Sequence, residues 1–386
     1  MDPHIDRLLR TASERAEMLT LGAGLPAQEL FPRAALERAF SAALHAAGDP
    51  ALQYGWPEGN PGLRATIASG LRRRHCDVRD DDVIITSGAQ QAVAIAVEAL
   101  LSAGDAIEVD AATYPAALDL FRSRGAVPVL ASHRPFGNGT PPRARYVMPG
   151  IDNPRGLDLT DVRRGELLSS PQPVIADEAY AYLHFRGPPR PLLADARDRV
   201  WHVGTFSKTL SPGLRIGYLV PPRADVAHAL ARKHATDLQA ASLTQSVLEH
   251  FLAQDDTERR LERARAFYAR RAERMLSALR RHLPGVRFRE PQGGFSVFVE
   301  LDEEGDDTTL LATATALGVS FDPGRLFRHD DASSPVAFRL CFSATSLAGI
   351  EEGIRRLARA LGRWRAEGTK PGVARAPEKQ ELTLAR

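Results

Sequence analysis

The chain has little lysine, little cysteine and no long apolar run. Only four of its 50 basic residues are lysines, namely Lys208, Lys233, Lys370 and Lys379. Two cysteines, Cys76 and Cys341, cannot build a disulfide framework, which favours a reducing compartment. No apolar run is long enough to cross a bilayer, and the N-terminus lacks the apolar core of a signal peptide. We therefore predict a cytoplasmic protein.

A strong net charge is also absent. The 50 basic and 48 acidic residues leave a net charge of +2, so no global field would attract nucleic acid or a membrane. The 44% hydrophobic and 25% charged residues are typical of a globular protein, and 386 residues are enough for two domains. We expect small-molecule ligands, with no nucleic-acid and no membrane partner.

From about residue 83 to 220, short apolar runs alternate with longer amphipathic ones. "DVIITSG" and "DAIEVD" indicate strands, whereas "AQQAVAIAVEALL" and "PAALDLFRSRG" indicate helices. Such alternation predicts an α/β fold with a mostly parallel sheet covered by helices on both faces. We predict four regions: an N-terminal arm with part of a small domain (1–45), a large domain (46–275), a small α+β domain (276–365) and a poorly ordered tail (366–386).

Lys208 lies among hydroxyls and glycines in "GTFSKTLSPGLRIGY". An arginine would supply charge or clamp an anion better. It could not lose a proton near neutral pH and become the amine that forms an imine. The alternative is that Lys208 is a remnant of an arginine-rich composition. The other three lysines are expected on a helix surface or in the tail.

Two strand ends could contribute to a site with Lys208. In "VIITSGAQQ", Ser87, Gly88 and Ala89 mark a turn from a strand into a helix, where exposed N–H groups bind anions or where small residues only pack. In "VIADEAY", Asp177 follows an apolar strand, where it could pair with a cationic ring nitrogen or cap the next turn.

Two arginines could bind anions. Arg215, with Thr205 and Ser207 nearby in sequence, could hold a phosphate group. Arg339, in the apolar strand "FRLCFS", needs a partner because an unpaired buried charge is costly. Either an internal carboxylate or a ligand carboxylate would serve. An imine-forming lysine, a phosphate cradle, a sheet-end aspartate and a carboxylate-binding arginine are together what pyridoxal phosphate chemistry requires.

The chain resembles the fold-type I pyridoxal-phosphate-dependent aminotransferases from about residue 20 to 362. Its motifs look closest to the branch with α-aminoadipate aminotransferases and the catalytic domains of MocR-type regulators. The matching stretches are "LGAGLPAQELFP", "YGWPEGNPGLR", "ITSGAQQ", "YVMPGIDNPRG", "ADEAY", "GTFSKTLSPGLRIGY", "EPQGGF", "GVSFDPGRLF" and "FRLCFS". The resemblance implies a seven-stranded sheet in the large domain and a homodimer with shared active sites.

The resemblance also implies the roles of individual residues. Lys208 would bind pyridoxal 5'-phosphate and carry protons, and Asp177 would pair with the ring nitrogen. The ring would be held by Asn153, Tyr180 and Tyr114. The phosphate would be held by Ser87, Gly88, Ala89, Gln90, Thr205, Ser207 and Arg215, and by Tyr54 across the dimer interface. The substrate carboxylate would be bound by Arg339, with Gly24 and Asn153 beside it.

Three features depart from the family pattern. Arg155 stands where the family usually has a threonine, and it would form an internal ion pair or influence substrate choice. Ala112 replaces a proline two residues before Tyr114. The segment between Tyr114 and Asn153 is shorter than usual, with a helix that the family normally has there reduced to the loop "SHRPFGNGTPPRA". We expect Trp56 and Tyr218 to pack, and we expect His133, His184 and His202 to bind no metal.

The implied activity is transfer of an amino group from an L-amino acid to a 2-oxo acid. An alternative is another pyridoxal phosphate reaction on an amino acid, such as elimination, cyclisation or oxidation, because the cofactor carries the chemistry and its surroundings select the bond that breaks. A non-catalytic sensor like the effector half of a MocR regulator would need a preceding DNA-binding domain, for which we see too few residues.

Overall fold

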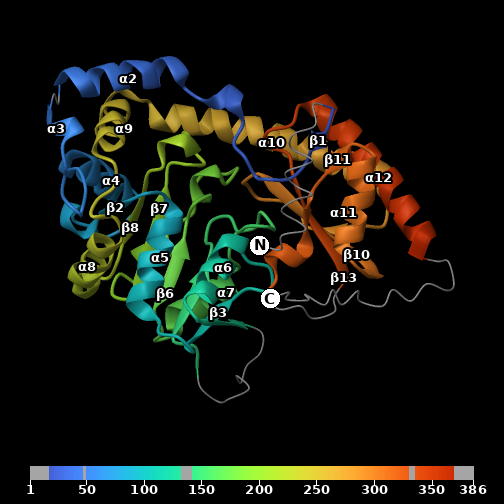
Figure 1. Cartoon of the computed structure of the whole chain (residues 1–386), viewed down its shortest axis with the longest axis horizontal. Coiled ribbons are helices and arrows are strands. Elements are labelled where there is room, and N and C mark those ends of the chain that lie inside the picture. The colour runs from blue at the N-terminus through green and yellow to red at the C-terminus, as the bar shows by residue number, and fades with distance from the viewer. Residues whose placement is uncertain (1–16, 47–48, 132–140, 330–334, 369–386) are drawn as a thin grey trace, which may run out of the picture.

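The computed structural model describes residues 17–46, 49–131, 141–329 and 335–368. These residues form a seven-stranded sheet, a four-stranded sheet and a two-stranded pair, with helices around them (Figure 1). The predicted fold class, a mostly parallel seven-stranded sheet flanked by helices with a smaller α+β part, is confirmed. Within the described residues, no helix is both long and apolar enough to span a bilayer.

The large sheet carries the strands predicted between residues 83 and 220. Their spatial order is β2 (Ile84–Thr86), β8 (Gly217–Val220), β7 (Val200–Thr205), β6 (Val174–Asp177), β5 (Ala144–Val147), β3 (Ala106–Val109) and β4 (Val127–Leu130). Only β8 is antiparallel to its neighbours, pairing with β2 on one side and β7 on the other. The central strands are almost entirely buried, as expected for a parallel sheet covered on both faces, although they include the charged residues Glu108, Arg145 and Asp177.

Helices cover both faces of this sheet. One face is packed by α5 (Ala89–Leu100) and α6 (Pro115–Ser123), with α8 (Val226–Asp237) against α5. Helix α10 (Thr257–His282) extends from this side to the small sheet, where it packs along α12. The other face is packed by α2 (Arg33–Ala46), α4 (Pro61–Arg73), α7 (Asp161–Ser169) and α9 (Ser242–Gln254). The short α3 (Asp49–Leu52) links α2 to the strand region. In Figure 1, α2 lies along the upper edge beside α9.

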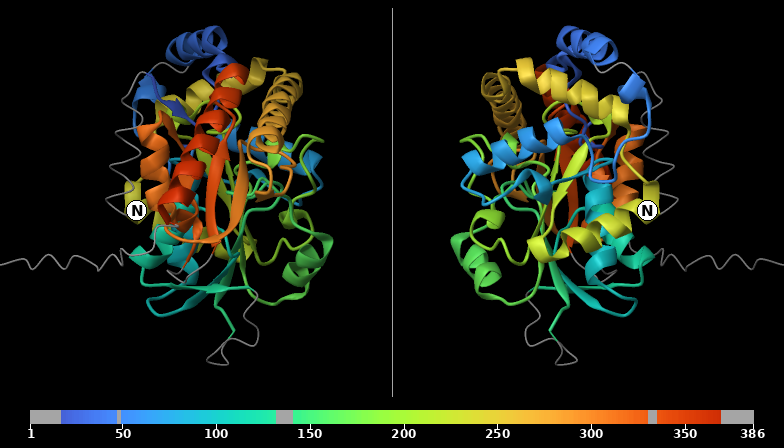
Figure 2. Two further views of the ribbon diagram at one scale, coloured as in Figure 1. Left: turned by 90° about the vertical axis from the view of Figure 1, so that its right-hand side faces the viewer. Right: turned by 90° about the vertical axis from the view of Figure 1, so that its left-hand side faces the viewer.

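The small sheet is antiparallel and is built from the C-terminal part of the chain. Its order is β12 (Asp322–Pro323), β13 (Pro335–Cys341), β10 (Ser296–Glu304) and β9 (Arg287–Phe288). Figure 2 shows α12 (Leu347–Gly368) packed along α11 (Asp307–Ala316). The N-terminal segment joins this region, because β1 (Leu19–Thr20) pairs with β11 (Val319–Ser320). This pairing supports the proposed assignment of the N-terminal arm to the small domain.

The predicted domain boundaries remain a prediction. Helix α10 runs through the proposed boundary at residue 275, and one apolar core extends from the large sheet into the small one. In that core, Ile175 and Val203 lie with Val297 and Phe338. Residues 366–368 of the predicted tail belong to α12, which ends at Gly368, and the remaining residues 369–386 lie outside the described residues.

Candidate active site

The reversed strand β8 brings distant segments to one edge of the sheet. Gly217, its first residue, pairs with Thr86 at the end of β2 and with Thr205 at the end of β7. A Cβ atom on Gly217 would lie 2.6 Å from the backbone carbon of Gly88, so only glycine permits this close approach. The residues that follow β2 and β7 therefore meet those that precede β8.

Several residues that we predicted to hold a phosphate group meet at this edge. Gly88, with a φ of +87°, is the N-cap of α5, and a Cβ on it would lie 2.5 Å from Arg215 Nη2. The same Nη2 donates a hydrogen bond to the carbonyl of Ser87 at 3.2 Å. Arg215 itself has a φ of +53°, a conformation that costs energy in a residue other than glycine. Arg215 is thus held across the open N-terminus of α5, beside Ser87, Gly88 and Ala89, where an anion is favoured.

Thr205 and Ser207 lie beside the cradle and are both buried. The Thr205 hydroxyl lies 3.0 Å from the carbonyl of Ile216 and accepts a hydrogen bond from the backbone N–H of Ser207 at 3.2 Å. Gln90 points elsewhere, because its Nε2 donates to the carbonyl of Ala116 at 2.8 Å. Its side chain therefore ties α5 to α6, while the Ser207 hydroxyl stays at the cradle.

Lys208 follows directly, in the turn after β7. Its Nζ lies 5.3 Å from the centre of the Tyr180 ring and 6.0 Å from that of Phe295. It makes no hydrogen bond to any other residue that the structure describes, so its amine is available to a ligand. The prediction that every other lysine lies on a surface or in the tail is wrong for Lys233, whose side chain is completely buried.

Asp177 is buried at the carboxyl end of β6, as predicted. One carboxylate oxygen accepts a hydrogen bond from the Tyr146 hydroxyl at 2.9 Å, and the other accepts from the backbone N–H of Ala179 at 3.1 Å. Burial raises the pKa of Asp177, while these hydrogen bonds and the nearby Lys208 charge oppose the increase. The site thus holds a carboxylate whose negative charge calls for a cationic partner.

Two tyrosines connect the two sides of the site. Tyr180 packs edge-on against Phe295, with ring centres 5.3 Å apart. Tyr114 is the N-cap of α6, and burial, Tyr180 and Asp177 raise its pKa to about 12, against the opposing charges of Arg339 and Arg215. Tyr114 therefore lies within electrostatic range of both predicted anion-binding arginines.

The Arg339 guanidinium is buried in β13 and is fixed by two side chains. Its Nε and Nη2 donate to Asp322 Oδ2 at 3.0 and 2.7 Å, and its Nη1 donates to Asn153 Oδ1 at 2.6 Å. The backbone of Gly24 faces it, since a Cβ there would lie 3.5 Å from Nη2. Of the two partners considered for Arg339, the internal carboxylate is therefore present, and N–H groups of Nη1 and Nη2 remain for a ligand.

Two further expectations, on Arg155 and Trp56, can be compared with the structure. Arg155 forms an internal ion pair, with its Nε 2.5 Å from Asp152 Oδ2 and its Nη2 3.5 Å from Asp110 Oδ2. Of the two aromatic residues expected to pack, Tyr218 is buried, whereas Trp56 is 73% exposed, with Tyr54 beside it 80% exposed. The loop from residue 132 to 140, with His133, lies outside the described residues. Among the described residues, no group of three His, Cys, Asp or Glu side chains could hold a metal.

Sequence reasoning missed Tyr146, Asp322 and Lys233. In the sequence, Tyr146 is indistinguishable from the other large residues of a buried strand. Its contact with Asp177 depends on the pairing of β5 with β6. Asp322 could have been suspected, because the buried Arg339 required a carboxylate. For Lys233, the available signal was its spacing of four residues from Asp237 on one helix, which allows the two side chains to pair.

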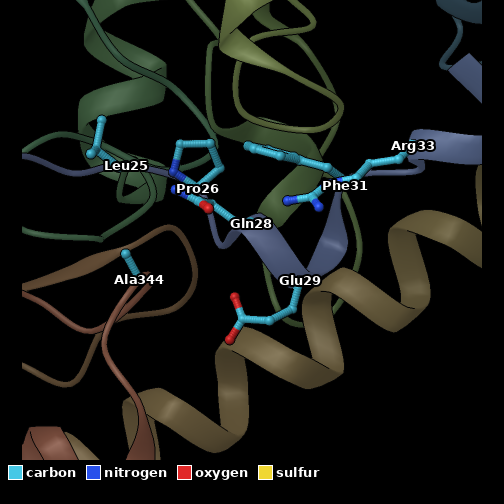
Figure 3. A pocket seen from close by; sticks show the side chains of 7 residues that line it. All are labelled: Leu25, Pro26, Gln28, Glu29, Phe31, Arg33 and Ala344. Carbon is cyan, nitrogen blue, oxygen red and sulfur yellow. The ribbon is translucent and has the colours of Figure 1, made fainter. Parts of the chain in front are cut away.

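Two pockets flank the N-terminal segment. One of about 350 Å³ contains Lys208 and is bordered by residues 26–32 and the start of α10. A larger one of about 590 Å³ lies along the same segment and is shown in Figure 3. There Glu29 extends towards α10, where its carboxylate lies 2.7 Å from Arg271 Nη2. Pro26, Glu29 and Phe31 border both pockets, so this segment forms one wall of the space beside Lys208.

Comparison with known proteins identifies the family. The family model "Aminotransferase class I and II" matches residues 16–139 and 144–357. The 2-aminoadipate transaminase of Thermus thermophilus is 34% identical over 378 residues, which cover 92% of this chain and 93% of that protein.

Solved structures agree with this match. A kynurenine aminotransferase of Pyrococcus horikoshii superposes with a TM-score of 0.88 at 30% identity, covering 94% of this chain and 95% of that one. An α-aminoadipate aminotransferase of Thermus thermophilus, complexed with N-(5'-phosphopyridoxyl)-L-leucine, superposes with a TM-score of 0.84 at 32% identity. The superposition covers 93% of this chain and 95% of that one. The chain therefore belongs to the class I and II aminotransferases and is a pyridoxal-phosphate-dependent enzyme that transfers amino groups.

Proposed function

We propose that Lys208, at the junction of the phosphate cradle, Asp177 and Arg339, is the residue through which this chain transfers an amino group from an L-amino acid to a 2-oxo acid. The observation that carries the proposal is the convergence of these four features at one edge of the sheet, around an amine with aromatic neighbours. Pyridoxal phosphate, when bound, supplies the electron sink that such a transfer needs. Lys208 Nζ is the group that attaches the cofactor and moves the proton.

The chain's own groups fit the phosphate. The free N–H groups at the start of α5 and the Arg215 guanidinium provide donors and positive charge for a dianion. Ser87, Thr205 and Ser207 add hydroxyls, and Gly88 keeps space open below Arg215. Gln90 contributes by holding α5 against α6 in this geometry.

The ring would lie between Lys208 and Asp177. Asp177 provides the negative charge that favours a protonated ring nitrogen, and Tyr146 and the Ala179 N–H keep the carboxylate in place. Tyr114 would cover one face of the ring, and Tyr180 and Asn153 would donate hydrogen bonds to its phenolic oxygen. Arg339, beside Gly24 and Asn153, would bind the substrate α-carboxylate.

Asp177→Asn should stabilise the cofactor-free protein at neutral pH while lowering transamination. Because the folded pKa of Asp177 is raised, the stability linked to its protonation is present in acid and is lost as pH rises through that pKa. Asparagine is neutral at every pH, so the variant does not lose this stability as the pH rises. Thermal melts of the cofactor-free variant and wild type should therefore agree near pH 4 and separate towards pH 7, with the variant higher. An equal difference in melting temperature between variant and wild type at every pH would contradict this account of the Asp177 charge.

Homodimerisation is part of the proposal. Four large apolar or aromatic side chains are strongly exposed, namely Leu52, Tyr54, Trp56 and Leu238. Leu238 follows Asp237, which contacts Ser87 of the cradle. A second copy would cover these four side chains and would place Tyr54 at the phosphate of the partner subunit. We further propose that the enzyme is cytoplasmic, in line with its two buried free cysteines.

The test is an absorption spectrum of the purified protein, first freed of cofactor and then titrated with pyridoxal phosphate. Single amino acids, including 2-aminoadipate, kynurenine and leucine, are then added without any 2-oxo acid. We expect loss of the yellow absorption with release of one 2-oxo acid per site. Release of ammonia or consumption of oxygen would instead favour elimination or oxidation, and failure to take up the cofactor would refute both.

A further inference from the structure

Lys233 is a fully buried lysine with one visible partner. It is completely inaccessible to solvent, on helix α8, and its Nζ lies 2.7 Å from Asp237 Oδ1. Burial of a lysine costs free energy unless a charge of opposite sign compensates it. In a chain with four lysines and many arginines, this position needs an explanation beyond surface charge.

The residues after Lys233 also break local rules. Asp237 is the last residue of α8, where the helix dipole disfavours a carboxylate. A lysine four residues before an aspartate is also the weaker orientation for such a pair. Leu238 then adopts a φ of +58°, which is unfavourable for a leucine. Locally unfavourable choices that cluster in this way are typical of functional positions.

Asp237 connects this cluster to the phosphate cradle. Its second oxygen, Oδ2, lies 3.3 Å from the Ser87 hydroxyl, which donates to it. The other polar groups of Ser87 are occupied, since its N–H donates to Gln91 Oε1 at 2.7 Å and its carbonyl accepts from Arg215. The hydroxyl has a single proton, so Asp237 and a phosphate oxygen would compete for it.

An ionised Asp237 would oppose phosphate binding in two ways. It would hold the Ser87 proton, and its charge would repel a dianion at the start of α5. The Lys233 ammonium neutralises that charge and weakens the carboxylate as an acceptor. We infer that Lys233 is a positioning residue for the phosphate of pyridoxal phosphate, acting through Asp237 to free the Ser87 hydroxyl. The inference rests on the proposed phosphate cradle.

The experiment is a titration of the cofactor-free full-length protein with pyridoxal phosphate and, separately, with pyridoxal, which lacks the phosphate. Lys233→Met should raise the Kd for pyridoxal phosphate about 10- to 100-fold, because the partly buried negative charge of Asp237 is left uncompensated beside the dianion. The Kd for pyridoxal should change by less than about threefold. The double variant Lys233→Met/Asp237→Asn should return to within about threefold of wild type, because no charge remains uncompensated.

The matched control is Arg232→Met, which removes the same charge from an exposed position one residue earlier on α8. It should leave both dissociation constants unchanged. If Lys233→Met does not fold, Asp237→Asn alone tests the inference, which requires that this variant does not bind pyridoxal phosphate more weakly than wild type. Weaker binding by Asp237→Asn, or equal losses for both ligands in Lys233→Met, would show a structural role and overturn the inference. A wild type that binds no pyridoxal phosphate would instead refute the proposed function.

Discussion

Lys208→Ala should lower the transamination rate by about 10⁴-fold or more, because it removes both the attaching amine and the proton carrier. The Lys208 side chain lies over the Tyr180 and Phe295 rings, and no other described lysine borders the pocket that contains it. Lys208→Arg should be as inactive as Lys208→Ala, since arginine keeps the charge but does not form an imine. Steady-state rates with a substrate identified by the spectral test provide the measurement.

The attachment site can be determined without kinetics. Borohydride reduction of the cofactor-loaded wild type, followed by peptide mass analysis, should place the cofactor on Lys208 among only four lysines. Lys379→Ala serves as the control and should behave like wild type. Attachment to Lys233 or to a tail lysine in the wild type, or activity retained by Lys208→Arg, would remove Lys208 from its proposed role.

Arg339→Met should reduce kcat/KM for amino acids on the order of 10²- to 10³-fold, the usual cost of losing a buried, hydrogen-bonded charge partner. Most of the loss should be in KM, because the carboxylate is bound alike in the ground state and the transition state. The Kd for pyridoxal phosphate should change little, since the cradle lies at Arg215 and α5 rather than at Arg339.

This variant also leaves Asp322 buried without its partner, which would destabilise the fold by itself. The double variant Arg339→Met/Asp322→Asn removes both charges and should recover the melting temperature without recovering kcat/KM. If the double variant regained activity as well, the Arg339 effect would be one of stability, and the carboxylate site would have to be sought elsewhere.

The sequence predicted the parts of the site that depend on a strand end. Asp177 and Ser87 follow short apolar runs that indicate buried strands, and parallel strands bring their carboxyl ends to one edge. Arg339 was predicted because a charge in an apolar strand requires a partner. The seven-stranded sheet and the family followed from motifs spread over nearly the whole chain.

The sequence could not predict features that depend on packing between elements. Lys233 has the pattern of a surface helix residue, and its burial is decided by where α8 lies against α5. Trp56 reads as a core residue by its size, yet it is exposed beside Tyr54. Asp322 and Arg339 are neighbours only through the antiparallel pairing of β12 with β13.

The reversal of β8 has a consequence for folding. Ser87 and Arg215 are 128 residues apart in sequence and meet only after β2, a three-residue edge strand, has joined β8. Contacts of such long range form late, because closing a long loop is entropically expensive. A ligand that bridges these two segments stabilises the completed edge by mass action. Retention of the cofactor therefore indicates that the edge strand β2 is paired with β8.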